Sequence, residues 1–191
     1  RQYILIPLLL VVVIDLIGFG IIIPLLPFYA ETFGASPQKV TMLMVVFSLS
    51  QFVAAPIWGG LSDKYGRRLI IWITLAGSIL AYIFLAYSNT LYSLFIARAF
   101  AGFMAGNIST AQAYISDITT KENRAKAMGF FGAAFGIGFI LGPAIGGILA
   151  GSDPKSPNTF LPPIFAATLS TFALLLALFL LKDTRLSLIH I

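Results

Sequence analysis

Six long apolar runs dominate this 191-residue sequence and restrict what it can fold into. A helix needs about 20 mainly apolar residues to cross the hydrocarbon core of a bilayer. Lipid offers the backbone no hydrogen-bonding partners, so only helices and closed barrels span membranes, and the runs lack the two-residue alternation of barrel strands. We therefore predict an all-α, polytopic membrane protein with spans at residues 4–29, 40–58, 69–87, 91–114, 127–150 and 163–181.

Composition and charge placement support this class. Hydrophobic residues make up 59% of the chain and charged residues 10%, whereas a soluble protein carries charge at about a quarter of its positions. An even number of crossings puts these basic residues on one side: Arg1, Lys64, Arg67, Arg68, Lys121, Arg124, Lys126, Lys182 and Arg185. The other side holds Lys39 and Lys155. By the positive-inside rule the amino terminus is cytoplasmic in the cell (inner or plasma) membrane, and the net charge of +5 requires no nucleic-acid partner.

A glycine and charge pattern marks the second loop. Its members are Gly59, Gly60, Leu61, Asp63, Lys64, Gly66, Arg67 and Arg68. An ordinary cytoplasmic turn would explain the arginines alone; the whole pattern resembles the signature of the major facilitator superfamily. The resemblance implies a gating loop in which Asp63 and Arg67 form a charge relay with Asp117 and Arg124 of the fourth loop. The alternative is four solvated charges, because exposed ion pairs are weak.

The fifth span is rich in glycine. The motif positions are Gly129, Gly138, Gly142, Pro143, Gly146 and Gly147. Small residues let helices pack closely in a bilayer, which would suffice as an explanation. Gly-Pro followed two residues later by Gly-Gly, however, resembles the antiporter motif of exporters in this superfamily, and a proline flanked by glycines gives a bend that moves easily. The motif favours efflux over the alternative, a solute/proton symporter that takes up sugars or organic anions.

Two charged residues lie inside predicted spans, together with the amide Gln51 and a polar stretch of the fourth span that includes Asn107, Ser109 and Gln112. Asp15 is midway along the first span and Arg98 about a third of the way into the fourth. Such charges cost about 2.5–3.5 kcal/mol at the bilayer centre, so each should face a cavity. The alternatives are snorkelling for Arg98 and a neutral, helix-locking acid for Asp15. We expect Arg98 to hold Asp15 ionised in one state, while a proton and a cationic or metal-chelated drug compete for Asp15 in another. Gln51 should face the same cavity, binding substrate or joining two helices.

The order of these features over residues 14–182 is similar to that of the tetracycline/proton antiporter group of drug exporters. Residues 94–102 resemble the fourth-helix pattern of the family, with Arg98 at its centre. One position departs: tetracycline pumps carry an aspartate in the third helix where this chain has Ala81. The resemblance implies a six-helix amino-terminal half built from inverted three-helix repeats, and proton-coupled efflux of a drug-like or tetracycline-like molecule by alternating access. It does not imply tetracycline itself.

We expect residues 1–185 to form this bundle, residues 186–191 to be a non-native tail, and a carboxy-terminal six-helix half to be missing. The expected partners are the lipid bilayer, a small-molecule substrate, protons and that second half. The chain has no cysteine, no nucleophile beside a base and no metal-ligand cluster, so we expect no enzyme, cofactor or metal site. A non-transporting receptor or scaffold is a further alternative, which Asp15, Asp63 and Arg98 disfavour because idle intramembrane charge is costly.

Overall fold

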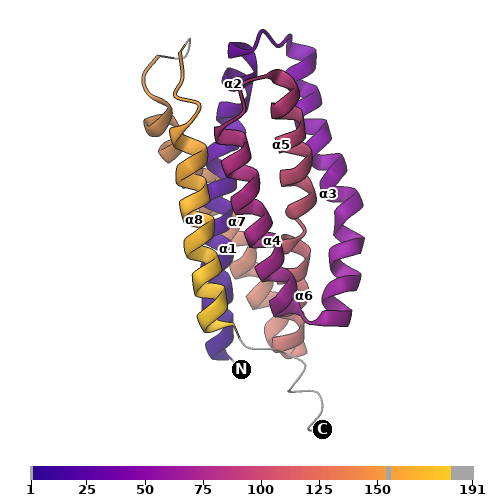
Figure 1. The fold of residues 1–191 in the computed structure, drawn as a ribbon. Coiled ribbons are helices and arrows are strands. Elements are labelled where there is room, and N and C mark those ends of the chain that lie inside the picture. The colour runs from indigo at the N-terminus through magenta and orange to yellow at the C-terminus, as the bar shows by residue number, and fades with distance from the viewer. Residues whose placement is uncertain (1, 154–155, 182–191) are drawn as a thin grey trace.

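The computed structural model describes residues 2–153 and 156–181, and within these ranges the chain is a bundle of long helices that run side by side (Figure 1). The elements are α1 (Gln2–Ile22), the 3₁₀ turn η1 (Ile23–Leu25), α2 (Leu26–Thr32), α3 (Pro37–Tyr65), α4 (Arg67–Ala86), α5 (Leu91–Met104), α6 (Asn107–Ile118), α7 (Lys121–Ala150) and α8 (Leu161–Leu180). The predicted tail at 186–191 lies outside the described residues and stays a prediction.

Six stretches of these helices are long and apolar enough to cross a membrane, which confirms the predicted number of spans. They are Leu5–Thr32, Pro37–Tyr65, Arg67–Ala86, Leu91–Ile118, Lys121–Ala150 and Leu161–Leu180. The first span combines α1, η1 and α2, and the fourth combines α5 and α6. Pro24 lies in η1, where its missing N–H helps to turn the α-helix into a 3₁₀ turn.

The helices extend further than predicted, so two expected loops are nearly absent. α3 continues to Tyr65 and α4 begins at Arg67, which leaves Gly66 as the whole second loop. Asp117 and Arg124 lie on α6 and α7, not in a loop. Gly66 has a φ of +101°, a conformation that only glycine adopts readily. The charged residues of these segments are helical because a helix can continue beyond the lipid.

The packing has the pattern of two related three-helix units. The first span packs on the fifth and sixth, and the fourth span packs on the second and third. Exchanging spans one to three with spans four to six maps the first pairing pattern onto the second, as repeats require. The third and sixth spans also pack on each other, through α4 and α8.

The interior holds two apolar clusters, and Asp15 lies where they meet along α1. One cluster includes Leu8 and Leu16 of α1 with Ile115 and Ala177; the other begins at Ile21. α1 begins and α8 ends at the same end of the bundle (Figure 1). We call this the basic end; it holds Lys64, Arg67, Arg68, Lys121, Arg124 and Lys126.

Candidate functional site

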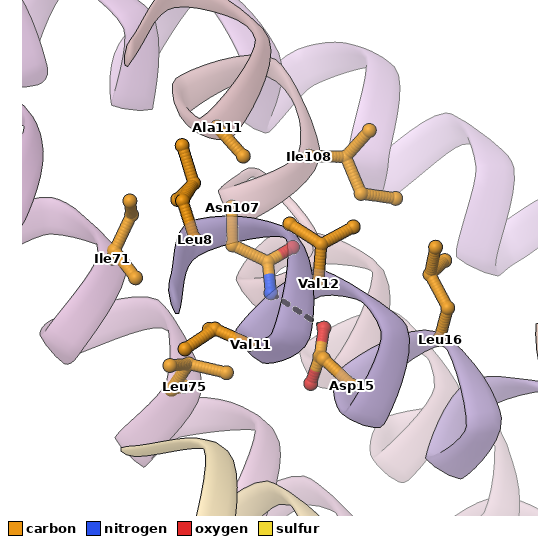
Figure 2. Close-up of a pocket in the computed structure, with 10 residues that line it drawn as sticks. All are labelled: Leu8, Val11, Val12, Asp15, Leu16, Ile71, Leu75, Asn107, Ile108 and Ala111. Carbon is orange, nitrogen blue, oxygen red and sulfur yellow. Dashed lines mark hydrogen bonds between the residues drawn. The ribbon is translucent and has the colours of Figure 1, made fainter. Parts of the chain in front are cut away.

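Asp15 accepts hydrogen bonds from neutral side chains of two other helices. Asn107 Nδ2 of α6 donates to Asp15 Oδ2 at 2.6 Å, and Ser170 Oγ of α8 donates to Oδ1 at 3.3 Å (Figure 2 shows the first bond). Ser170 is fully buried and Asn107 is 8% exposed. Sequence reasoning noted Asn107 only as polar and overlooked Ser170. α1, α6 and α8 thus meet at the Asp15 carboxylate, and the shorter of its two hydrogen bonds comes from the Asn107 amide.

A break in the fourth span positions Asn107. α5 ends at Met104 and α6 begins at Asn107, so the helix is interrupted next to Asp15. Trp58 Nε1 of α3 donates to the Phe103 carbonyl at 2.6 Å, which satisfies an acceptor close to the break. A side chain on Gly106 would collide with the Trp58 ring. Gly106 and the Trp58 indole together hold the interrupted part of the span against α3.

Arg98 is buried and does not pair with Asp15 in this conformation, so the pairing expected in one state stays a prediction. It is 3% exposed, and its guanidinium lies 4.2 Å from the centre of the Phe47 ring. Among residues 2–153 and 156–181, no ion pair joins Arg98 to Asp15, and Arg98 Nε has no hydrogen-bond partner. Similar depth in the membrane does not bring the two side chains into contact here, because Arg98 points towards α3 while Asp15 points towards α6 and α8.

Both charges nevertheless line one cavity of about 30 Å³. Its wall includes Ser78, Ala81 and Tyr82 of α4 beside Asp15 and Arg98. A second cavity of about 20 Å³ lies on the other side of Asp15, and its lining is apolar apart from Asp15 and Asn107 (Figure 2). Asp15 therefore separates a polar hollow from an apolar one.

Gln51 does not line the cavity that Asp15 and Arg98 share. It lines a more open hollow of about 350 Å³ between α3 and α6, together with Ser48, Ser109 and Gln112. The polar stretch of the fourth span thus divides: Asn107 turns to Asp15, while Ser109 and Gln112 face this hollow. In this conformation Gln51 thus lines a different hollow from the one that Asp15 and Arg98 share, and its role stays a prediction.

Arg67 is the centre of an ion-pair cluster at the basic end. It pairs with Asp63 at 2.7 Å and with Asp117 at 2.9 Å, and its Nη1 donates to Ser62 Oγ at 2.5 Å. The Arg67 side chain is 15% exposed, while those of Asp63 and Asp117 are 67% and 41% exposed. Three of the four predicted relay residues therefore meet, across the one-residue turn at Gly66.

The remaining basic residues of the predicted gate contact other helix ends. Arg124 Nη2 donates at 2.9 Å to the carbonyl of Ser116, the residue that precedes Asp117. Arg68 Nη2 donates to the Leu178 carbonyl of α8 at 2.8 Å, and its guanidinium lies 4.2 Å from the centre of the Trp72 ring. Arg68 thus fastens α8 to α4. Gly59 of the predicted motif faces open space.

The glycines of α7 divide into two faces. A side chain on Gly138, Gly142 or Gly146 would meet the backbone of α1 at 2.5–2.9 Å, closer than atoms can approach. A side chain on Gly129 or Gly147 would meet nothing within 4 Å. Pro143 lies inside α7, which continues as one helix to Ala150. Three motif glycines therefore bring α7 against α1, and the others lie on its exposed face.

In the described part of the chain, no cluster of three or more histidine, aspartate or glutamate side chains could hold a metal ion. The site consists of separated charges, an amide and hydroxyl groups beside small cavities. It can exchange protons and bind a charged group.

Residues 8–188 match the sequence profile of the Major Facilitator Superfamily, and the chain belongs to that family. It is thus a multi-pass membrane protein from a family of transporters, not of enzymes.

Its relatives include named drug-resistance proteins. The tetracycline resistance protein of class H from Pasteurella multocida is 37% identical over 180 residues, covering 93% of this chain and 44% of that protein. The class B protein from Escherichia coli is 33% identical with the same coverage. The quinolone resistance protein NorA of Staphylococcus aureus is 32% identical over 88% of this chain and 42% of its own length. The chain spans less than half the length of these relatives.

Solved structures share the fold. The human organic anion transporter MFSD10 superposes with a TM-score of 0.81 at 25% identity, over 96% of this chain and 48% of that one. The proton:xylose symporter XylE has the same TM-score at 15% identity, over 96% of this chain and 46% of that one, which speaks for the fold alone. The chain therefore matches about half of a transporter of this family.

Proposed function

We propose that this chain is the amino-terminal half of a proton-coupled exporter of drug-like small molecules, with Asp15 as the group that exchanges a proton for substrate. The arrangement around Asp15 carries the proposal. A carboxylate with neutral partners at 2.6 and 3.3 Å, beside a cavity, can be neutral or ionised without breaking an ion pair. A proton and a cationic substrate group can then compete for it, because each neutralises the same charge.

The relatives support a drug-like substrate and export. Tetracycline and quinolone resistance proteins are both among them, so the chain is related to exporters of more than one drug class. Ala81 lines the cavity, and the resemblance to the tetracycline pumps implies that they carry an aspartate at this position. The substrate is accordingly not assigned to tetracycline.

Transport requires the second six-helix half in this proposal. Transporters of this kind bind substrate between two related halves and expose it alternately to each side. The exposed glycine face of α7 and the exposed apolar residues of α3, such as Phe52 at 77% exposure, would face lipid or that second half. The basic end would lie in the cytoplasm of the inner or plasma membrane, where the Arg67 cluster would hold the gate shut in one state.

The test uses inside-out membrane vesicles that contain the full-length transporter carrying this chain. A proton gradient, acidic inside, should drive accumulation of a drug by the wild type and by Asp153→Asn, which changes an exposed carboxylate far from Asp15. Asp15→Asn should insert normally and lose gradient-driven accumulation. Unchanged accumulation in Asp15→Asn would refute the role of Asp15, and substrate movement in the same direction as protons would show symport.

A further inference from the structure

Arg98 is a buried cation without an anionic partner among the described residues. Its guanidinium carries five N–H donors, yet Nε has no hydrogen-bond partner, no ion pair to Arg98 is found within 2–153 and 156–181, and the guanidinium lies 4.2 Å from the centre of the Phe47 ring. At 3% exposure it does not reach the membrane surface by snorkelling. A buried charge without a partner is costly inside a membrane, and a ligand that pairs with Arg98 is the simplest explanation for its presence.

The adjoining cavity has the size of a small anionic group. One water-sized group needs about 10–15 Å³ of such space, and the cavity of about 30 Å³ beside Arg98 therefore holds about two. The two oxygens of a carboxylate meet this requirement, and the planar fork of an arginine matches their geometry. Ser78 and Tyr82 line the same cavity and offer hydroxyl donors.

The built-in carboxylate of this cavity is already engaged elsewhere. Asp15 is directed to Asn107 and Ser170, from α6 and α8. Ala81, which is 1% exposed and lines the cavity, supplies no charge. An anion that binds Arg98 in this conformation must therefore come from outside the described residues.

We propose that Arg98 binds a carboxylate-type anionic group of the transported molecule. Because Asp15 lines the same cavity, the substrates would be amphoteric organic molecules that present an anionic group to Arg98 and a cationic group towards Asp15. This inference rests on the proposed function of drug export and names the substrate class for the same site.

The test compares two dyes that differ in the anionic group alone. Rhodamine B carries a carboxylate and a cationic ring system, and its ethyl ester keeps only the cation. Binding to the purified full-length transporter in nanodiscs is measured by fluorescence polarisation without a proton gradient. Rhodamine B should bind at least about tenfold more tightly than the ester, because a site built for a charged group rejects an analogue that lacks it.

Two variants remove the site in different ways. Arg98→Gln deletes the cation, and Ala81→Asp adds a competing carboxylate to the cavity while keeping Arg98. Each should abolish the preference for rhodamine B. The ester carries only the cation and should bind each variant at least as tightly as the wild type, which also reports that the variant is folded. Lys39→Gln removes an exposed cation at the end opposite the basic end and should keep the preference.

Equal binding of the two dyes by the wild type, or a preference that survives in both Arg98→Gln and Ala81→Asp, would overturn the anion site. If gradient-driven efflux of a drug persisted in that case, the proposed function would stand without it. Carboxylate-selective binding by a protein that shows no gradient-driven efflux would support the anion site and overturn the proposed export.

Discussion

Replacing Gly142 by alanine should weaken the contact between α1 and α7, whereas the same replacement at Gly147 should not. Both glycines belong to the motif of α7. An alanine Cβ at 142 would lie 2.5 Å from the Gly20 backbone and 2.8 Å from the Ile21 nitrogen, where ordinary contact begins at 3.4 Å. At 147 the Cβ would meet nothing within 4 Å. The two variants therefore differ in the clash and not in the chemistry of the substitution.

The magnitude follows from two opposing effects. Alanine favours a helix over glycine by about 1 kcal/mol, and this gain applies to both variants. Overpacking costs about 1–3 kcal/mol, and only Gly142→Ala incurs it. The atoms in the way are backbone atoms, which cannot rotate aside, so we expect a difference near the upper end of that range.

Equilibrium unfolding in mixed micelles of dodecyl maltoside and dodecyl sulfate, followed by far-ultraviolet circular dichroism, measures this difference. Gly142→Ala should unfold at a lower fraction of dodecyl sulfate than Gly147→Ala. Equal stability of the two variants would refute the reasoning, because it would mean that α1 and α7 do not approach as closely as their glycines allow.

Two further substitutions probe the contacts at the basic end and at the break in the fourth span. Asp117→Asn removes one partner of Arg67, and a double-mutant cycle with Arg67→Gln should give a coupling of about 0.2–1 kcal/mol, because the pair is partly exposed; a coupling of zero would show that the bridge contributes nothing to stability. Trp58→Phe keeps a ring but leaves the Phe103 carbonyl without its donor, and should cost about 1–3 kcal/mol in the same unfolding assay. An unchanged unfolding midpoint in Trp58→Phe would contradict this role of the indole.

The number of spans was predictable because apolar length is a property of the sequence alone, while the helix ends were not. Hydropathy indicates where lipid ends, and α3 continues past that level through Asp63 to Tyr65. The break before Asn107 was also missed. An isolated glycine such as Gly106 is tolerated within helices, so only its contact with Trp58 shows why the span is interrupted there.

The absence of a pair between Asp15 and Arg98 in this conformation has a geometric reason. Counting residues along a helix gives the depth of a side chain in the membrane, but contact also depends on which face of the helix carries it. Arg98 lies on the face of α5 that packs on α3, and Asp15 faces α6 and α8. The sequence predicted that both charged residues face a cavity, and both line one. Their contact partners could be identified only from the packed structure.

The two charges of the cavity belong to helices that are packed in different ways. Gly102 of α5 lies against the backbone of Phe47, where an added side chain would collide, so α5 and the Arg98 guanidinium are closely tied to α3. Asp15 is tied instead to α6 and α8. The interruption between α5 and α6 separates Arg98 from Asn107, the partner of Asp15, within a single span. A shift of α3 and α5 relative to α1 would therefore change the separation of the charges without breaking an ion pair. The electrostatic effect of the Arg98 cation on Asp15 depends on that separation. Such a shift would therefore change how readily Asp15 binds a proton, which is the property that coupled transport requires.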